Sequence, residues 1–187
     1  MRNIYKLLSL SLILILPFCS YAGNPDRVGQ AGATELLNNP WARSSGMQGV
    51  LISGIQGVEA MRLNVAGLVH QEGTQFLLSR GNYFQGSGIY INSFGFSRTL
   101  GSDNSNAIGV TLSSFDFGEI EITNQDNPEG GIGTYSPSML NIGLAYSKKF
   151  SDKISGGALV RVINQSTGKV NASGIAIDAG IQYATDI

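Results

Sequence analysis

From about residue 74 onward, large apolar residues fall on every second position in segments that are separated by turn residues. The clearest segment is 140–146, which reads LNIGLAY and places Asn141 on a face of small and polar residues. Segment 175–183, which reads IAIDAGIQY, repeats the pattern and places Asp178 and Gln182 on its polar face. A period of two is typical of a β-strand whose two faces meet different surroundings.

The same pattern along the rest of the chain predicts six strands. They span about 74–84, 88–99, 107–123, 138–150, 154–166 and 173–185. In the fifth strand, Arg161 and Gln165 lie opposite an apolar face. In the second and third strands the apolar phase slips, and near Ser113 this predicts a β-bulge or a strand that runs beyond the membrane. Long loops at 101–106 and 124–137 alternate with short turns, which is the arrangement expected of the two sides of an outer-membrane barrel.

The amino-acid composition indicates which class of β-sheet protein the chain belongs to. Charged residues make up 13% of the chain, against about 25% in soluble domains. Glycine supplies 25 of the 187 residues, nearly twice the usual share of about 7%. Low charge, high glycine and the lack of a long apolar run exclude a helical membrane protein. They favour an antiparallel transmembrane β-barrel, in which only alternate residues face lipid. The polar residues that this register directs into the lumen are Asn141, Arg161, Asp178 and Gln182.

Six strands are too few to close such a barrel, because the smallest usual number is about eight. We therefore expect the chain to be the N-terminal part of a longer barrel protein, with residues 74–187 supplying an incomplete wall. A small secreted β-sandwich would show the same alternation and is the alternative fold.

Residues 1–22 have the organisation of a secretory signal peptide. Two basic residues precede a short apolar run, and SYA at 20–22 supplies small residues at the positions that a signal peptidase reads. We expect cleavage after Ala22. Cys19 makes a lipoprotein anchor the alternative, although Phe18 stands where a lipid-attachment site has a small residue.

Residues 23–73 precede the first strand and lack its alternation. A short helix is expected from Ala31 to Leu37, because the sequence NNP at 38–40 would end it. The stretch 42–68 is apolar yet rich in glycine, so its backbone can bend sharply and pack closely against other backbone. Inside a barrel this predicts a compact plug, since irregular backbone at membrane depth persists only where protein encloses it. A cap over one end of the barrel is the alternative.

The chain offers little material for catalysis. His70 is the only histidine, no Gly-x-Ser-x-Gly motif is present, and no cysteine follows the signal peptide. We therefore expect no enzyme activity, catalytic residue, metal site or cofactor, and we expect His70 to be a solvated linker residue. The net charge of -1 argues against nucleic acid as a partner. Arg161 and Asp178 are expected to form a cross-strand ion pair, or to act as lumen charges that hold the plug or screen solutes.

The mature chain contains several short motifs at characteristic distances from one another. They are GQAGA at 29–33, ELL at 35–37, ARSSGMQG at 42–49, NVAGL at 64–68, YSKKFSD at 146–152 and DAG at 178–180. In this order they resemble the PorV/PorQ family, which are outer-membrane proteins of the FadL-like barrel class. Val65 departs from the family pattern, because a proline is usual there. The residues that carry the N-terminal resemblance are Gly32, Ala42, Arg43, Gly46, Met47, Gly49, Asn64, Gly67 and Leu68.

The resemblance implies a function in type IX protein secretion at the bacterial outer membrane. Members of the family are thought to take cargo from the translocon by binding the cargo's C-terminal signal domain, and to pass it on for attachment at the cell surface. The implied partners are the secretion translocon, secreted proteins with that domain, and outer-membrane lipid. The alternative function is FadL-like transport of hydrophobic solutes, in which segment 46–61 would line an apolar pocket.

Overall fold

The computed structural model describes residues 32–101, 103–168 and 170–185. From Ala33 onward, these residues belong to one compact unit. The expected signal peptide, and the expected plug residues that precede Gly32, lie outside the described residues. Within the described ranges, no helix is both long enough and apolar enough to cross a membrane.

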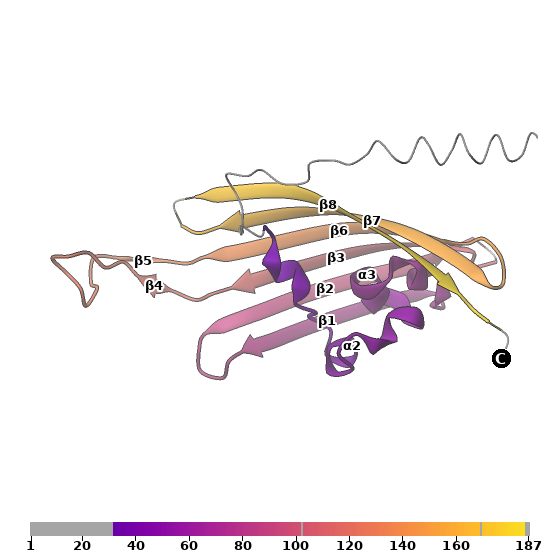
Figure 1. Ribbon diagram of the computed structural model, residues 1–187, viewed down its shortest axis with the longest axis horizontal. Coiled ribbons are helices and arrows are strands. Elements are labelled where there is room, and N and C mark those ends of the chain that lie inside the picture. The colour runs from indigo at the N-terminus through magenta and orange to yellow at the C-terminus, as the bar shows by residue number, and fades with distance from the viewer. Residues whose placement is uncertain (1–31, 102, 169, 186–187) are drawn as a thin grey trace, which may run out of the picture. The chain divides into compact units, whose positions relative to one another are not determined.

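Six long strands form one antiparallel sheet, in which successive strands pair with each other (Figure 1). They are β1 (Thr74–Tyr83), β2 (Ile89–Leu100), β3 (Asn106–Asp116), β6 (Ser138–Lys149), β7 (Ile154–Ser166) and β8 (Asn171–Tyr183). Two further short strands, β4 (Ile120–Glu121) and β5 (Thr134–Tyr135), pair with each other in a separate ribbon. The prediction of an all-β, antiparallel chain is therefore confirmed.

The third strand differs from its prediction, because it ends at Asp116 and contains no bulge. Its pairing with both neighbours is continuous through Ser113. The apparent slip arises because Phe115 points to the face that the helices cover, where it is only 5% exposed. Ile91 of β2, which is 3% exposed, produces the second apparent slip in the same way. Both positions are apolar on the face that was expected to be polar throughout.

The two predicted long loops are consecutive connections at opposite ends of β3, so the expected alternation of long loops with short turns is wrong at this strand. Residues 101–105 join β2 to β3, whereas residues 117–137 join β3 to β6 and carry the β4–β5 ribbon. The ribbon extends past the ends of the long strands (Figure 1). We call the end of the sheet with 84–88 and 117–137 the ribbon end, and the end with 101–105 and 150–153 the turn end.

The two faces of the sheet differ in exposure. One face, here called the inner face, includes Ala107 and Leu159, which are fully buried. The other, here called the outer face, includes Leu144, Val160 and Ile177, which are all exposed. The alternation read from the sequence therefore separates a covered face from an open one.

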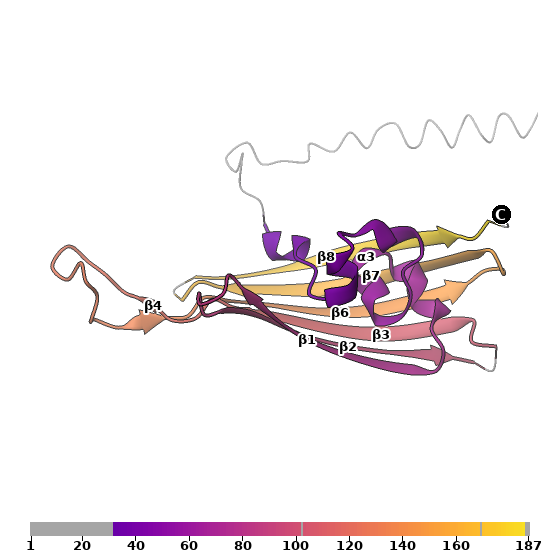
Figure 2. The same cartoon turned by 90° about the horizontal axis from the view of Figure 1, so that it is seen from below.

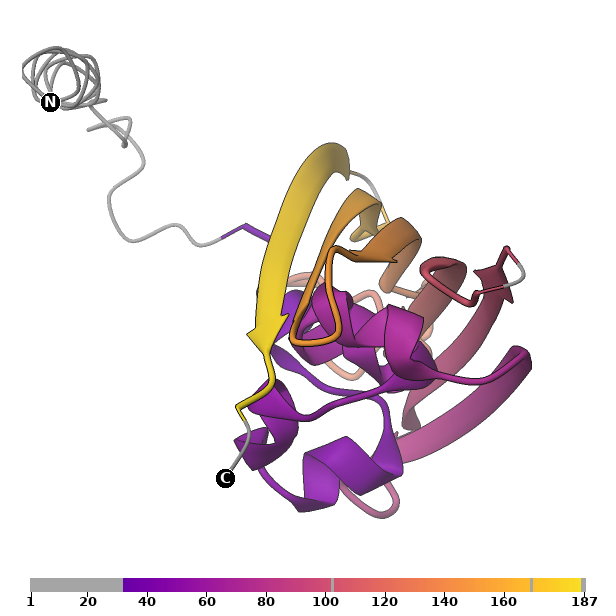
Figure 3. The same cartoon turned by 90° about the vertical axis from the view of Figure 1, so that its right-hand side faces the viewer.

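Residues 33–73, here called the helical segment, lie against the inner face, and the strands curve around them (Figures 2 and 3). The helices are η2 (Thr34–Leu37), α2 (Ala42–Gly46), η3 (Val50–Ser53), η4 (Gly57–Glu59), α3 (Ala60–Leu63) and η5 (Val65–His70), where η marks a 3₁₀ helix. Glycines keep them short. Gly49, for example, turns the chain before η3 with φ +78°, a conformation that residues with a β-carbon rarely adopt. The helix expected before residues 38–40 is present as η2.

The core lies between the helical segment and the inner face. The segment contributes Trp41, Val58, Met61, Val65, Leu68 and Val69, and the sheet contributes Ala107, Ala145 and Leu159. The sheet side is built from small residues, so the helices approach it closely. At Gly109, for instance, a β-carbon would lie 2.5 Å from the sulfur of Met61. The second part of the apolar, glycine-rich stretch, from Ile55 onward, is therefore packed inside the curved sheet, whereas most of residues 42–54 are exposed.

Candidate functional site

The contact between the helical segment and the inner face is the candidate functional site, because the sheet buries polar side chains there. These include Ser97, Thr111, Asn141, Ser147, Ser155, Arg161 and Gln182. Buried polar groups need hydrogen-bond partners, so their partners show how the segment is held. In the part of the chain that the structure describes, no group of three or more His, Cys, Asp or Glu side chains is arranged to hold a metal ion.

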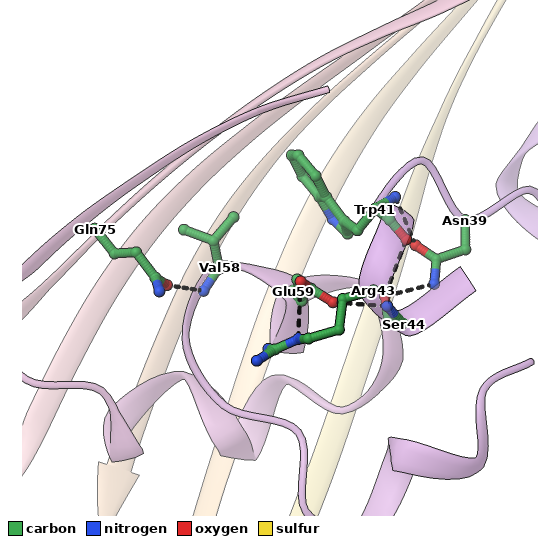
Figure 4. Close-up of polar contacts among 7 residues, drawn as sticks. All are labelled: Asn39, Trp41, Arg43, Ser44, Val58, Glu59 and Gln75. Atoms are coloured by element: carbon green, nitrogen blue, oxygen red, sulfur yellow. Dashed lines mark hydrogen bonds and ion pairs between the residues drawn. The ribbon is translucent and has the colours of Figure 1, made fainter. Parts of the chain in front are cut away.

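Glu59 fixes helix α2 (Figure 4). Its Oε2 accepts a hydrogen bond from the backbone N of Ser44 at 3.1 Å, and its Oε1 lies 3.2 Å from Nε of Arg43. The carboxylate therefore satisfies an amide in the first turn of a helix that has no side-chain cap of its own. The side chain of Arg43 is 63% exposed and that of Glu59 only 10%. Water screens the ion pair, so the buried amide contact is the more important of the two.

Trp41 connects the same helix to the sheet (Figure 4). Its indole is 2% exposed, and a β-carbon at Gly95 of β2 would lie 3.3 Å from the ring. Asn39 shapes the turn that positions the indole. Its Oδ1 accepts from the backbone N of Trp41 at 3.1 Å, and its Nδ2 donates to Oγ of Ser44 at 2.8 Å.

Two side chains of β1 hold the segment at one edge of the sheet. Oε1 of Gln75 accepts from the backbone N of Val58 at 2.8 Å (Figure 4). Oγ of Ser79 donates to the carbonyl of Pro40 at 2.6 Å. Both partners are backbone atoms of the helical segment, so these bonds fix the path of its chain.

Asn64 joins three elements at the opposite edge. Its Oδ1 accepts from the backbone N of Ala66, which caps helix η5 at 3.2 Å. Its Nδ2 donates to the carbonyls of Ile52 in η3, at 3.2 Å, and Ile181 in β8, at 3.1 Å. The asparagine of the NVAGL motif therefore positions η5 and η3 against β8, and it uses both its oxygen and its nitrogen to do so.

Gly67 and Gln182 complete this contact. A β-carbon at Gly67 would lie 1.9 Å from the carbonyl oxygen of Ile55, so only glycine fits. Nε2 of Gln182 donates to that same carbonyl at 3.0 Å. The glycine of the motif thus lets the backbone of η5 approach the backbone at Ile55, where the Gln182 side chain of β8 also binds.

Arg161 is the buried charge of the interface, with 5% of the residue exposed. The expected ion pair with Asp178 forms, since Nη2 of Arg161 lies 3.1 Å from Oδ2 of Asp178. The same Nη2 donates to the carbonyl of Met61 at 3.2 Å. Burial, and in second place the nearby charge of Arg161, lowers the pKa of Arg62 to about 10. The guanidinium of Arg161 therefore binds both the sheet and helix α3, and its positive charge disfavours the positive charge on Arg62.

Asn141 lies near Arg161 and Glu35 at a small cavity of about 10 Å³. Oε2 of Glu35 accepts from Nε2 of Gln165 at 2.8 Å, which holds helix η2 to β7. The Oδ1 of Asn141 and the Oε1 of Glu35 are buried without a hydrogen-bond partner among the described residues. Asn141, Arg161, Asp178 and Gln182 all project from the inner face.

The remaining motif residues do not share one place. Leu68 is fully buried in the core. Gly32, Gly46 and Gly49 have open space where a β-carbon would stand, and Met47 is 47% exposed. In helix α2, which covers the first five residues of the motif ARSSGMQG, only Ser44 is buried.

His70 is not a solvated linker residue, contrary to expectation. It is the last residue of η5, and its Nε2 lies 2.9 Å from Oγ of Ser155, which is 1% exposed. Burial, followed by the charge of Lys149, lowers the pKa of His70. The pair fastens η5 to β7, and the serine is too deeply buried to meet a substrate.

Trp41, Glu59, Gln75 and Gly180 were not among the predicted site residues. Two of them carried a signal in the sequence, since Trp41 is the only tryptophan and Glu59 is the only acid between residues 36 and 71. Gly180 lies in the DAG motif, but its contact and that of Gln75 required knowledge of which strand positions meet the helical segment. Comparison with known protein families and with curated proteins finds no match for this chain.

Proposed function

We propose that this chain forms part of the wall and the plug of an outer-membrane β-barrel of the FadL-like class. We further propose that it serves as a PorV-like accessory component of type IX secretion, which binds the C-terminal signal domain of cargo and passes the cargo on for surface attachment. The observation that carries the proposal is the hydrogen bonding of the helical segment across the whole sheet, from Gln75 in β1 to Gln182 in β8. A segment that is held at both edges suits a barrel whose interior stays closed while its loops bind a partner.

The outer face supports a place in a membrane. Ile175 and Ile177 of β8 are each 74% exposed, and Leu144 of β6 is 63% exposed. A continuous apolar surface of this kind marks a contact with lipid or protein, and lipid-facing strands need no further cover. Tyr146 and Tyr183 lie on the same face toward the turn end, as aromatic residues do at a membrane boundary.

The edges of the sheet support closure by further strands. Among the described residues, neither β1 nor β8 has a second pairing partner. Their free backbone groups must be paired in lipid, because the hydrocarbon region offers no water. A completed wall would also face the exposed apolar side chains of the helical segment, which include Leu37, Met47, Val50 and Ile52.

The β4–β5 ribbon is the part that we propose binds cargo. Residues 117–137 extend beyond the strands and contain four acidic residues and no basic residue (Figure 1). Long loops of outer-membrane barrels lie on the extracellular side, and rim loops commonly carry binding surfaces. An acidic ribbon favours a basic surface on the cargo's C-terminal domain, because complementary charge directs association.

The test is purification of the tagged full-length gene product from detergent-solubilised outer membrane, followed by mass spectrometry. The matched variant neutralises the ribbon with Glu119→Gln, Glu121→Gln, Asp126→Asn and Glu129→Gln. We expect the wild type to recover a large translocon barrel and secreted proteins that share one C-terminal domain. The variant should recover less cargo while its own amount in the membrane is unchanged. Recovery of the wild-type protein alone, or with lipid only, contradicts the secretion role.

Transport of hydrophobic solutes is the second candidate. It is favoured by Met47, Val50 and Ile52, which expose apolar surface on the side of the helical segment away from the sheet. It is disfavoured by Ile55 and Val58, which lie in the stretch expected to line a pocket but are buried against other residues. Uptake of a labelled fatty acid that is equal in wild-type and deletion strains would rule this function out.

A further inference from the structure

A groove crosses the outer face near the turn end of the sheet. Ala158 of β7 and Ala179 of β8 lie along its floor, and Ile181 lies at its side. The ring of Phe150 covers Gly156, where a β-carbon would lie 2.8 Å from the ring. Its volume is about 670 Å³, which is in the range of ligand-binding sites. The lining is mostly apolar and comes from β6, β7 and β8 and from Phe150 in the turn after β6.

The groove follows from a change in side-chain size along neighbouring strands. Strand pairing aligns Leu144, Val160 and Ile177 in one row across the outer face. The next row toward the turn end carries Ala158 and Ala179, and the row after that has a glycine on β7. The outer surface is therefore lowered at the Ala158 row, between the bulky apolar row on one side and the Phe150 ring over Gly156 on the other.

Tyr146 forms a fixed wall of the groove. It pairs with Ala158 across β6 and β7, and its hydroxyl donates to Oδ1 of Asn106 at 2.7 Å. From Gly156, which the Phe150 ring covers, to Val160 the strand runs roughly 13 Å, and the open floor is the part between the ring and Val160. A narrow apolar channel of this length suits part of one acyl chain better than a folded partner.

A positive charge lies at the turn end of the groove. Lys148 pairs with Gly156 on β7, lines the groove and is exposed. No ion-pair partner of Lys148 occurs among the described residues. The rim therefore complements an anionic group that sits above an apolar chain.

We propose that this groove binds an anionic phospholipid, with one acyl chain on the floor of Ala158 and Ala179 and the phosphate beside Lys148. The inference rests on the proposed place of the chain in an outer membrane. It adds a specific lipid site at the turn end, which is opposite to the ribbon that we propose for cargo.

The experiment is native mass spectrometry of the full-length protein in detergent, with equal amounts of phosphatidylglycerol and phosphatidylcholine that have identical acyl chains. One lysine near an anionic interface is worth about 1 kcal/mol, so we expect phosphatidylglycerol to be retained about fivefold more strongly. Equal retention of the two lipids by the wild type would overturn the proposal.

Two variants separate the charge from the groove. Lys148→Gln should lower retention of phosphatidylglycerol to that of phosphatidylcholine, whereas Arg98→Gln, on the same face of β2, should not. Ala158→Leu should remove retention of both lipids, because the new side chain fills the floor. Val162→Leu, on the same face of β7 but outside the groove, is its control. Retention by Ala158→Leu that equals the wild type would also overturn the proposal.

Two other results have distinct meanings. A lipid-free dimer that Ala158→Leu disrupts would assign the groove to a second copy of the chain and overturn the lipid site. A protein that does not fractionate with the outer membrane would overturn both this inference and the proposed function. A protein in the membrane without preference between the two lipids would overturn this inference alone.

Discussion

Gly180 of β8 lies so close to Asn64 of the helical segment that a β-carbon at position 180 would stand 2.1 Å from Oδ1 of Asn64. The same Asn64 donates to the carbonyl of Ile181, the next residue along β8. Glycine at 180 therefore lets a motif asparagine reach the backbone of the sheet. The contact connects the high glycine content of the strands to the position of the helical segment.

Gly180→Ala is expected to destabilise the protein by about 1–3 kcal/mol, because the added methyl group must displace the Asn64 side chain. Gly174→Ala is the matched control on the same face of β8, where no heavy atom lies within 4 Å of the new carbon. We expect the control to change stability by no more than about 0.5 kcal/mol. Denaturant unfolding of the full-length protein in detergent measures both effects. Equal effects of the two substitutions would show that Asn64 moves away freely.

Glu59→Ala is expected to cost about 1–3 kcal/mol, because it leaves the buried backbone N of Ser44 without its acceptor. Arg43→Ala should cost less than about 1 kcal/mol, since the Arg43 side chain is largely exposed. Thermal unfolding and the rate at which a protease cuts the helical segment check this difference. A larger loss for Arg43→Ala would mean that the ion pair, and not the amide contact, holds helix α2.

The sheet could be predicted from the sequence because β6, β7 and β8 follow one rule over most of their length. Most of their outer positions are apolar and most of their inner positions are small or polar, so the period of two is visible. The rule failed at Ile91, Phe115, Leu159 and Ile163, where the inner face is apolar. These residues face the helical segment, and a pattern along one strand does not contain information about what covers that strand.

The candidate site could be predicted only in part for the same reason. Asn64 and Gly67 stood out in a motif, but their partners did not. Asn64 contacts Ile181, which is 117 positions away in the sequence, and Gly67 contacts the backbone of Ile55. Every residue has a backbone carbonyl, so a hydrogen bond to that group does not constrain the residue type of the partner. The contact of Gln75 with the backbone of Val58 is hidden from sequence reasoning in the same way.

Arg161→Met is expected to loosen helix α3 and to destabilise the protein by about 1–3 kcal/mol, because the Met61 carbonyl loses a buried donor. Asp178→Asn should cost less than about 1 kcal/mol, since the side chain of Asp178 is 51% exposed. Loss of the Arg161 charge should also raise the pKa of Arg62 from its lowered value. Protease resistance of the helical segment and passage of small solutes are the measurements. No change in either for Arg161→Met would remove the idea that this charge holds the segment.

His70 makes the stability of the protein depend on pH. Because burial and Lys149 lower the pKa of His70 in the folded chain, the unfolded chain binds a proton first as the pH falls. The free energy of unfolding should therefore decrease as the pH drops through about 6.5, the pKa of an unperturbed histidine, and level off below the folded pKa. His70→Gln can still bond to Ser155 but does not titrate, so its stability should stay flatter over this interval.

The measurement is the urea midpoint of wild type and His70→Gln at a series of pH values from 8 down to 5. His70→Asn is a second variant, with a shorter side chain that tests whether the reach to Ser155 matters for stability at pH 8. Parallel curves for wild type and His70→Gln would contradict the lowered pKa, because the wild type would then gain no extra proton on unfolding. A decline of the wild type alone would assign the acid sensitivity to the contact between η5 and β7.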